Sequence, residues 1–173
     1  MKQLAISMAA LVLMSEAALA HATFETPDVT QKSTAKMVLR VPHGCKGEPT
    51  LKVRLQIPEG IVAVKPMPKA GWGLETVIGD YANSYELHGS KITDGVKEII
   101  WTGSLDDAHF DEFTFRGYFS EALEVGKKVY IPAIQECANG KEEWINIPAE
   151  GDATRIDHPA PAVTITEPGH AHH

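Results

Sequence analysis

The 173-residue sequence is poor in several residue classes that mark common protein functions. It has only two cysteines, too few for the paired Cys-x-x-Cys motifs of a zinc module, and neither has the His and Met neighbours of a blue-copper loop. It contains no P-loop and no Ser, His and Asp set that would indicate a hydrolase. These absences argue against a zinc module, a nucleotide-binding enzyme and a serine hydrolase.

Positive charge is also scarce. The sequence has 16 Lys and Arg against 23 Asp and Glu, which gives a formal net charge of −7. Loss of residues 1–20 would not change this value, because Lys2 and Glu16 would leave together. An acidic surface repels phosphate backbones, so we expect no nucleic-acid partner.

Beyond its first 20 residues, the sequence has no apolar run close to the roughly 20 residues that a transmembrane helix needs. Those first residues carry one early positive charge at Lys2 and an apolar run from Leu4 to Met14. They close on Ala18-Leu19-Ala20, with small residues at the −3 and −1 positions of a signal-peptidase site. The pattern predicts a signal peptide over 1–20, cleavage after Ala20, and a periplasmic or secreted product without a transmembrane segment.

Cleavage after Ala20 would make His21 the first residue of a 153-residue chain. A free α-amino group and an imidazole on one residue can hold a metal ion in a chelate ring, which an internal histidine cannot do. The α-amino pKa of about 7.7–8.0 lets a metal displace its proton near neutral pH. Cu(II) favours such nitrogen donors in a tetragonal plane, so His21 is a candidate copper ligand.

Strand patterns dominate the rest of the sequence, and no dozen residues show a helical period. Apolar and polar residues alternate without a break from Leu51 to Ile57, and turn residues separate this run from others. Further strands are predicted up to Val41, over 97–102, and around Phe113, Phe115 and Phe119, which share one face. A late strand is predicted over 129–137, with a hairpin partner over 144–147. The pattern predicts an all-β, antiparallel β-sandwich in one domain, over residues 21–163, followed by a flexible tail over 164–173.

The two cysteines, Cys45 and Cys137, are an even number in a predicted oxidising compartment, so we expect them to form one disulfide. The bridge would close a loop of about 90 residues and contribute up to about 4–5 kcal/mol on the chain-entropy model. A copper–thiolate site is the alternative, and the surroundings of the cysteines do not favour it.

An ordered set of short motifs resembles the YcnI-like domains of exported bacterial proteins. It runs through His21-Ala22-Thr23-Phe24-Glu25, Val41-Pro42, Ile57-Pro58, Pro66-Met67-Pro68, Gly71-Trp72, Ile100-Trp101-Thr102-Gly103, Asp111-Glu112-Phe113 and Trp144. The resemblance implies an immunoglobulin-like sandwich that binds Cu(II) and handles copper outside the cytoplasm. It also implies a copper site made of the N-terminal His, a Glu after the second strand and a nearby Trp.

Carried over to this sequence, the resemblance makes His21 the bidentate copper ligand and Trp144 the tryptophan beside the metal. A neutral indole N–H has no lone pair for a metal, so Trp144 would shield the ion, cover Cu(I) by a cation–π contact, or supply an electron. The sequence departs from the family where Asn-Glu should follow Val-Pro, because it has His43-Gly44 there. We favour His43 as the replacement ligand, with Glu25 and Glu136 as alternatives.

The remaining histidines are weaker candidates for metal binding. The terminal His170, His172 and His173 form a short tract that could scavenge metal weakly. His88, His109 and His158 have no partner at ligand spacing, so we interpret them as surface or structural residues. Trp72 and Trp101 are interpreted as packing residues.

Three functions follow, and we favour the first. It is a non-catalytic periplasmic copper-binding protein in copper trafficking, with a membrane copper transporter or a periplasmic copper protein as the partner that the resemblance implies. The second is a copper-dependent redox enzyme of the monooxygenase type, which 7% aromatic residues and no stacking row do not favour. The third is an immunoglobulin-like interaction module without a metal. The sequence leaves open whether copper is carried as Cu(II) or Cu(I).

Overall fold

The computed structural model describes residues 21–149 and 156–169, and over these ranges it is built of strands without any helix. The strands are β1 (Thr23–Phe24), β2 (Asp28–Thr30), β3 (Ser33–Val41), β4 (Thr50–Gln56), β5 (Ile61–Pro66), β6 (Gly73–Leu87), β7 (Ser90–Leu105), β8 (Asp111–Phe119), β9 (Lys128–Tyr130), β10 (Ala133–Glu136), β11 (Lys141–Trp144) and β12 (Ala162–Thr166). The prediction of an all-β sandwich is confirmed. In the described part of the chain no helix is long and apolar enough to cross a bilayer.

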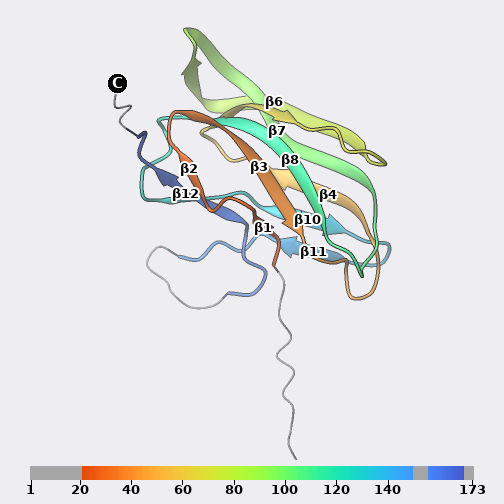
Figure 1. Cartoon of the computed structure of the whole chain (residues 1–173). Coiled ribbons are helices and arrows are strands. Elements are labelled where there is room, and N and C mark those ends of the chain that lie inside the picture. The colour runs from red at the N-terminus through yellow and green to blue at the C-terminus, as the bar shows by residue number, and fades with distance from the viewer. Residues whose placement is uncertain (1–20, 150–155, 170–173) are drawn as a thin grey trace, which may run out of the picture.

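The strands form two larger sheets and one small one (Figure 1). The first sheet has the order β1-β3-β8-β5, and the second has the order β11-β10-β4-β7-β6. A third sheet, β2-β12-β9, contains the one parallel pairing among the described strands, between β12 and β2. Every other pairing is antiparallel.

Alternating apolar residues explain why the two large sheets pack against each other. In the first sheet Leu39 pairs with Phe113, and both side chains are fully buried. In the second sheet Val53 pairs with Trp101, again with both side chains fully buried. Each such side chain contributes roughly 1.5–3 kcal/mol compared with leaving it in water.

Two of the three tryptophans pack on one phenylalanine in this core. The ring centroids of Trp72 and Trp101 lie 4.9 and 5.4 Å from that of Phe113. Trp101 is completely buried and Trp72 is half-buried. The interpretation of both as packing residues is confirmed.

The predicted strand over 129–137 is wrong, because the chain divides there into β9 and β10. β9 pairs with β12 in the small sheet, whereas β10 pairs with β4 and β11 in the large one. Pro132 lies between the two strands, and a proline has no N–H to continue a ladder.

The predicted hairpin after β10 is present, but its second strand is Lys141–Trp144 instead of 144–147. Trp144 pairs with Ala133, the first residue of β10. The partner strand therefore ends there, and the chain beyond Trp144 leaves Ile145 and Ile147 exposed.

The largest element that the sequence did not predict is β6, which forms with β7 the hairpin that projects at the top of Figure 1. β6 spans 15 residues at the edge of its sheet, and only two of them, Tyr81 and Tyr85, are buried. A strand that buries so few side chains lacks the alternation by which strands are recognised.

The predicted domain boundary at residue 163 falls inside β12 and is wrong. Val163 and Ile165 are both 1% exposed and belong to the main core. Because residues two apart in a strand share a face, the core needs Ile165 as much as Val163. The predicted signal peptide over 1–20 and the histidines at 170, 172 and 173 lie outside the described residues.

Candidate metal centre

The site is organised around Trp144, the last residue of β11, whose side chain is 3% exposed. Three imidazole rings surround its indole, with centroid distances of 5.8 Å for His21, 6.5 Å for His43 and 5.2 Å for His158. They come from the segment before β1, the β3–β4 loop and the segment before β12. The fold thus brings the three predicted site residues together and adds His158 to them.

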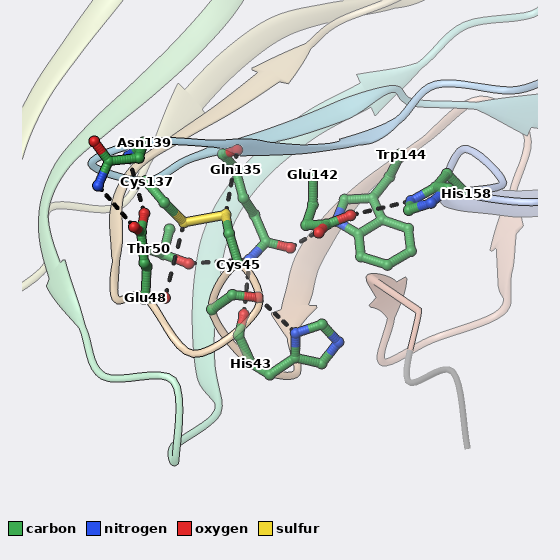
Figure 2. Close-up of a disulfide and its surroundings, with 11 residues drawn as sticks. His43, Cys45, Glu48, Thr50, Gln135, Cys137, Asn139, Glu142, Trp144 and His158 are labelled. Atoms are coloured by element: carbon green, nitrogen blue, oxygen red, sulfur yellow. Dashed lines mark hydrogen bonds and ion pairs between the residues drawn. A yellow bond between two sulfur atoms is a disulfide. The ribbon is translucent and has the colours of Figure 1, made fainter. Parts of the chain in front are cut away.

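Gln135 in β10 holds this group from beneath and is completely buried. The indole N–H of Trp144 donates a 2.6 Å hydrogen bond to its Oε1 atom. Its Nε2 group donates to the carbonyl oxygen of His43 at 2.8 Å and to the hydroxyl of Thr50 at 3.0 Å. Gln135 therefore fixes the indole relative to the His43 loop (Figure 2). The sequence analysis missed it, although an isolated Gln on the apolar face of a strand is an available signal.

The His43 ring is oriented by a hydrogen bond through one of its two nitrogens. Its Nδ1 atom lies 2.6 Å from the carbonyl oxygen of Gly44, and a carbonyl can only accept, so Nδ1 carries the proton. In the neutral ring Nε2 then keeps its lone pair, which is the form that binds a metal.

Gly44 occupies the position where the resemblance implied a Glu, and the structure explains why this position has no side chain. A Cβ atom added to Gly44 would collide with the backbone carbonyl oxygen of Glu48. Cys45 and Glu48 exchange two backbone hydrogen bonds, of 2.9 and 3.1 Å, which close this tight turn. A carboxylate at position 44 would need a different loop.

The predicted disulfide is confirmed, with an S–S distance of 2.05 Å and a Cα–Cα distance of 6.1 Å between Cys45 and Cys137. A second link lies beside it, where the Asn139 side chain and backbone N–H donate to the Glu48 carboxylate at 2.8 and 2.9 Å. These two hydrogen bonds lower the pKa of Glu48. Together the bonds fasten the His43 loop to the β10–β11 hairpin.

Glu142 and His158 form a pair that the sequence analysis did not find. The Glu142 side chain is 11% exposed, and its Oε2 atom lies 3.3 Å from Nδ1 of His158. Glu142 and Trp144 are two apart on β11 and share a face, which is a signal that the sequence offered. His158 was interpreted as a surface or structural residue because it has no partner at ligand spacing in the sequence; its side chain is 46% exposed, and its contacts with Glu142 and Trp144 are made across the fold.

A cleft of about 710 Å³ opens over this group. Its lining includes His43, Glu142, Trp144 and His158, together with Asp107 and Lys46. His21 is not in the lining, although its ring contacts the same indole.

The two alternative carboxylate ligands are engaged elsewhere. Glu25 forms an ion pair with Arg40 at 2.9 Å, and Glu136 forms ion pairs with Lys52 and Arg54 at 3.3 Å each. Neither residue lines the cleft in the part of the chain that the structure describes. Glu142, by contrast, lines the cleft and shares a face of β11 with Trp144.

The donor set suits copper in its chemistry, since imidazole nitrogens are ligands for Cu(II). Among residues 21–149 and 156–169, no three His, Cys, Asp or Glu side chains are close enough together to hold one ion as they stand. Binding therefore requires imidazole rings to turn toward a common point. The α-amino group of His21 is a further donor only after the bond to Ala20 has been cut.

Comparisons with known proteins agree with this fold. A family model described as a domain of unknown function, DUF1775, matches residues 21–165. A crystal structure of an uncharacterized protein from Nocardia farcinica, described as having an immunoglobulin-like fold, is similar with a TM-score of 0.61. That similarity covers 84% of this chain and 98% of the other at 20% sequence identity, which shows a shared fold. No curated protein matches the chain.

Proposed function

The chain belongs to the DUF1775 family and has an immunoglobulin-like fold, and from this premise we propose that it is an exported, YcnI-like copper-binding protein. In this proposal Cu(II) is held by the amine and imidazole of His21 once the leader is removed. The protein carries or buffers copper without catalysis, in the periplasm or outside the cell.

The observation that carries the proposal is the meeting of His21, His43 and Trp144. These residues are far apart in the sequence, and the N-terminal pattern and the family resemblance predict them as site residues. The ring centroids of His21 and His43 lie 5.8 and 6.5 Å from that of the Trp144 indole. A packing role for Trp144 alone would not require two imidazoles beside it.

Each residue has a distinct part in the proposed site. The amine and imidazole of His21 supply two adjacent corners of a tetragonal Cu(II) plane, and Nε2 of His43 supplies a third nitrogen. Trp144 cannot donate a lone pair, and its N–H is already bonded to Gln135, so it shields the ion from water on one side. A membrane copper transporter or another periplasmic copper protein is the partner that such a carrier would serve.

The N-terminus gives the first test. We expect a chain that begins at His21 to bind one Cu(II) and a chain with one extra residue before His21 to bind roughly a hundredfold more weakly, about 2.8 kcal/mol. The extra residue turns the His21 amine into an amide and removes one chelating nitrogen. Competition titration against a chelator of known affinity measures the difference.

Equal affinity of the two chains would contradict the proposal, and so would mass spectrometry that finds another N-terminus on the exported protein. Peroxide-dependent oxidation of a polysaccharide by the copper-loaded chain would favour the monooxygenase alternative instead. Circular dichroism of both metal-free chains controls for an effect of the extra residue on folding.

A second prediction concerns His43. With His21 free, His43→Ala should lower Cu(II) affinity roughly tenfold and change the electron paramagnetic resonance (EPR) spectrum, because one equatorial nitrogen is lost. His109→Ala is the control, since His109 does not line the cleft. Unchanged affinity and spectrum in His43→Ala would remove His43 from the ligand set.

A further inference from the structure

We propose that His158 is a further copper ligand and that Glu142 is the carboxylate that orients it. This inference rests on the proposed function, because it assigns ligands to the same ion. In this inference the carboxylate of Glu142 takes the place of the one missing at Gly44, and it acts by orienting the His158 imidazole.

The position of His158 supports the assignment. Its ring is nearer to the Trp144 indole than either predicted histidine, at 5.2 Å between centroids, and it lines the same cleft as His43 (Figure 2). Its side chain is 46% exposed, so the ring has room to turn toward an ion in the cleft.

The Glu142 carboxylate lies beside one nitrogen of the His158 ring, with its Oε2 atom 3.3 Å from Nδ1. An acceptor 3.3 Å from Nδ1 favours the tautomer with hydrogen on that nitrogen, which leaves the lone pair of Nε2 for a metal. Histidine ligands in metalloproteins commonly have such a carboxylate behind them. His43, which has the Gly44 carbonyl behind its Nδ1 atom, has the same arrangement.

Burial of Glu142 gives a reason for the pair to bind a cation. A carboxylate with only 11% of its side chain exposed is poorly solvated, so positive charge nearby stabilises it, and Lys46 and Lys141 line the same cleft. A neutral imidazole supplies little of that charge, whereas an imidazole bound to Cu(II) is polarised toward the metal and supplies more. Metal binding at His158 would thus stabilise Glu142, and Glu142 would strengthen the metal bond.

The backbone at His158 is held in an unusual conformation. Its φ angle is +47°, in the left-handed region that few residues other than glycine adopt. Asn146 fixes this segment, because its N–H donates to the carbonyl of His158 at 3.2 Å and its side chain donates to the carbonyl of Asp157 at 2.7 Å. The N–H of Ala160 donates in turn to the carbonyl of Asn146 at 2.9 Å. These hydrogen bonds hold the His158 backbone in place beside the cleft.

The test uses a matched pair of substitutions, His158→Asn and His88→Asn, in the chain that begins at His21. Both histidines have positive φ angles, +47° and +51°, and asparagine tolerates this region, so each variant loses an imidazole without added backbone strain. His88 lies in the turn between β6 and β7 and lines a different groove. Cu(II) affinity is measured by competition titration, and the number of coordinated nitrogens by EPR superhyperfine structure.

We expect His158→Asn to lower Cu(II) affinity roughly tenfold and to remove one nitrogen from the EPR pattern, with His88→Asn unchanged. Glu142→Gln should weaken binding less and keep the nitrogen count, since the imidazole remains. The shift of the thermal midpoint on adding Cu(II) should be smaller in His158→Asn than in the unsubstituted chain. That copper-induced shift separates a ligand from a residue that only stabilises the metal-free fold.

An unchanged affinity and nitrogen count in His158→Asn would overturn this inference and leave the proposed function standing, provided that the N-terminal extension still weakens binding. If the unsubstituted chain binds no Cu(II), both proposals fail. A variant that melts lower without copper but has the normal affinity and nitrogen count would assign His158 a structural role and also overturn the inference.

Discussion

Replacing both Cys45 and Cys137 by alanine is expected to lower the free energy of unfolding by about 2–5 kcal/mol. The disulfide joins positions 92 residues apart, and cutting so long a loop gives the unfolded chain much conformational entropy. We also expect weaker Cu(II) binding, because the bridge is one of the links that hold the His43 loop against β10.

Urea unfolding of the metal-free double variant, followed by circular dichroism, measures this loss. Reduction of the unsubstituted protein is the control, and it should reproduce the loss without any change of sequence. An unchanged midpoint with an unchanged slope would mean that the bridge contributes nothing to stability. The other links of the loop, through Gln135 and Glu48, remain in the variant.

Gln135→Leu is expected to lower the free energy of unfolding by about 3 kcal/mol or more. The substitution keeps much of the side-chain volume but removes the hydrogen bonds of the Gln135 side chain to Trp144, His43 and Thr50. A buried polar group left without a partner costs about 1–3 kcal/mol, and the completely buried position excludes water as a substitute.

Gln56→Leu is the matched control, because Gln56 is an exposed residue of the neighbouring strand β4, and surface changes are usually within about 0.5 kcal/mol. The fluorescence of Trp144 should also change in Gln135→Leu, since its indole N–H loses its acceptor. Equal unfolding midpoints for the two variants would contradict the role given to Gln135.

Short-range patterns in the sequence predicted the parts of the fold that obey them. The strands β3, β4 and β8 bury the predicted faces, and β3 and β8 also bury Val38 and Thr114 on the opposite face. The cysteine pair forms its bond. β6 was missed because it lies at a sheet edge and buries only Tyr81 and Tyr85. The strand over 129–137 was predicted too long because the apolar alternation continues through Pro132, whereas the pairing partners change there.

The residues of the candidate site also fall into a predicted group and a group that the sequence did not predict. His21, His43 and Trp144 were selected from local sequence or from the resemblance, and they meet. Gln135 and His158 were not, because each owes its role to residues far away in the chain: Gln135 to the His43 loop, 92 positions earlier, and His158 to Glu142 and Trp144 on another strand. Strand alternation can mark Gln135 as a polar residue on an apolar face, but it does not identify the distant residues that Gln135 and His158 contact.

The place of His158 in the chain has a consequence for the timing of assembly. Ribosomes make polypeptides from the N-terminus, so His21 is among the first of these residues to emerge and His158 is the last. The segment that holds His158 is anchored by the bridge of Asn146 to Pro159 and by the pairing of β12 with β2 and β9. An incomplete chain therefore contains His21 but lacks His158, so the cleft can form only after the C-terminal segment has been synthesised.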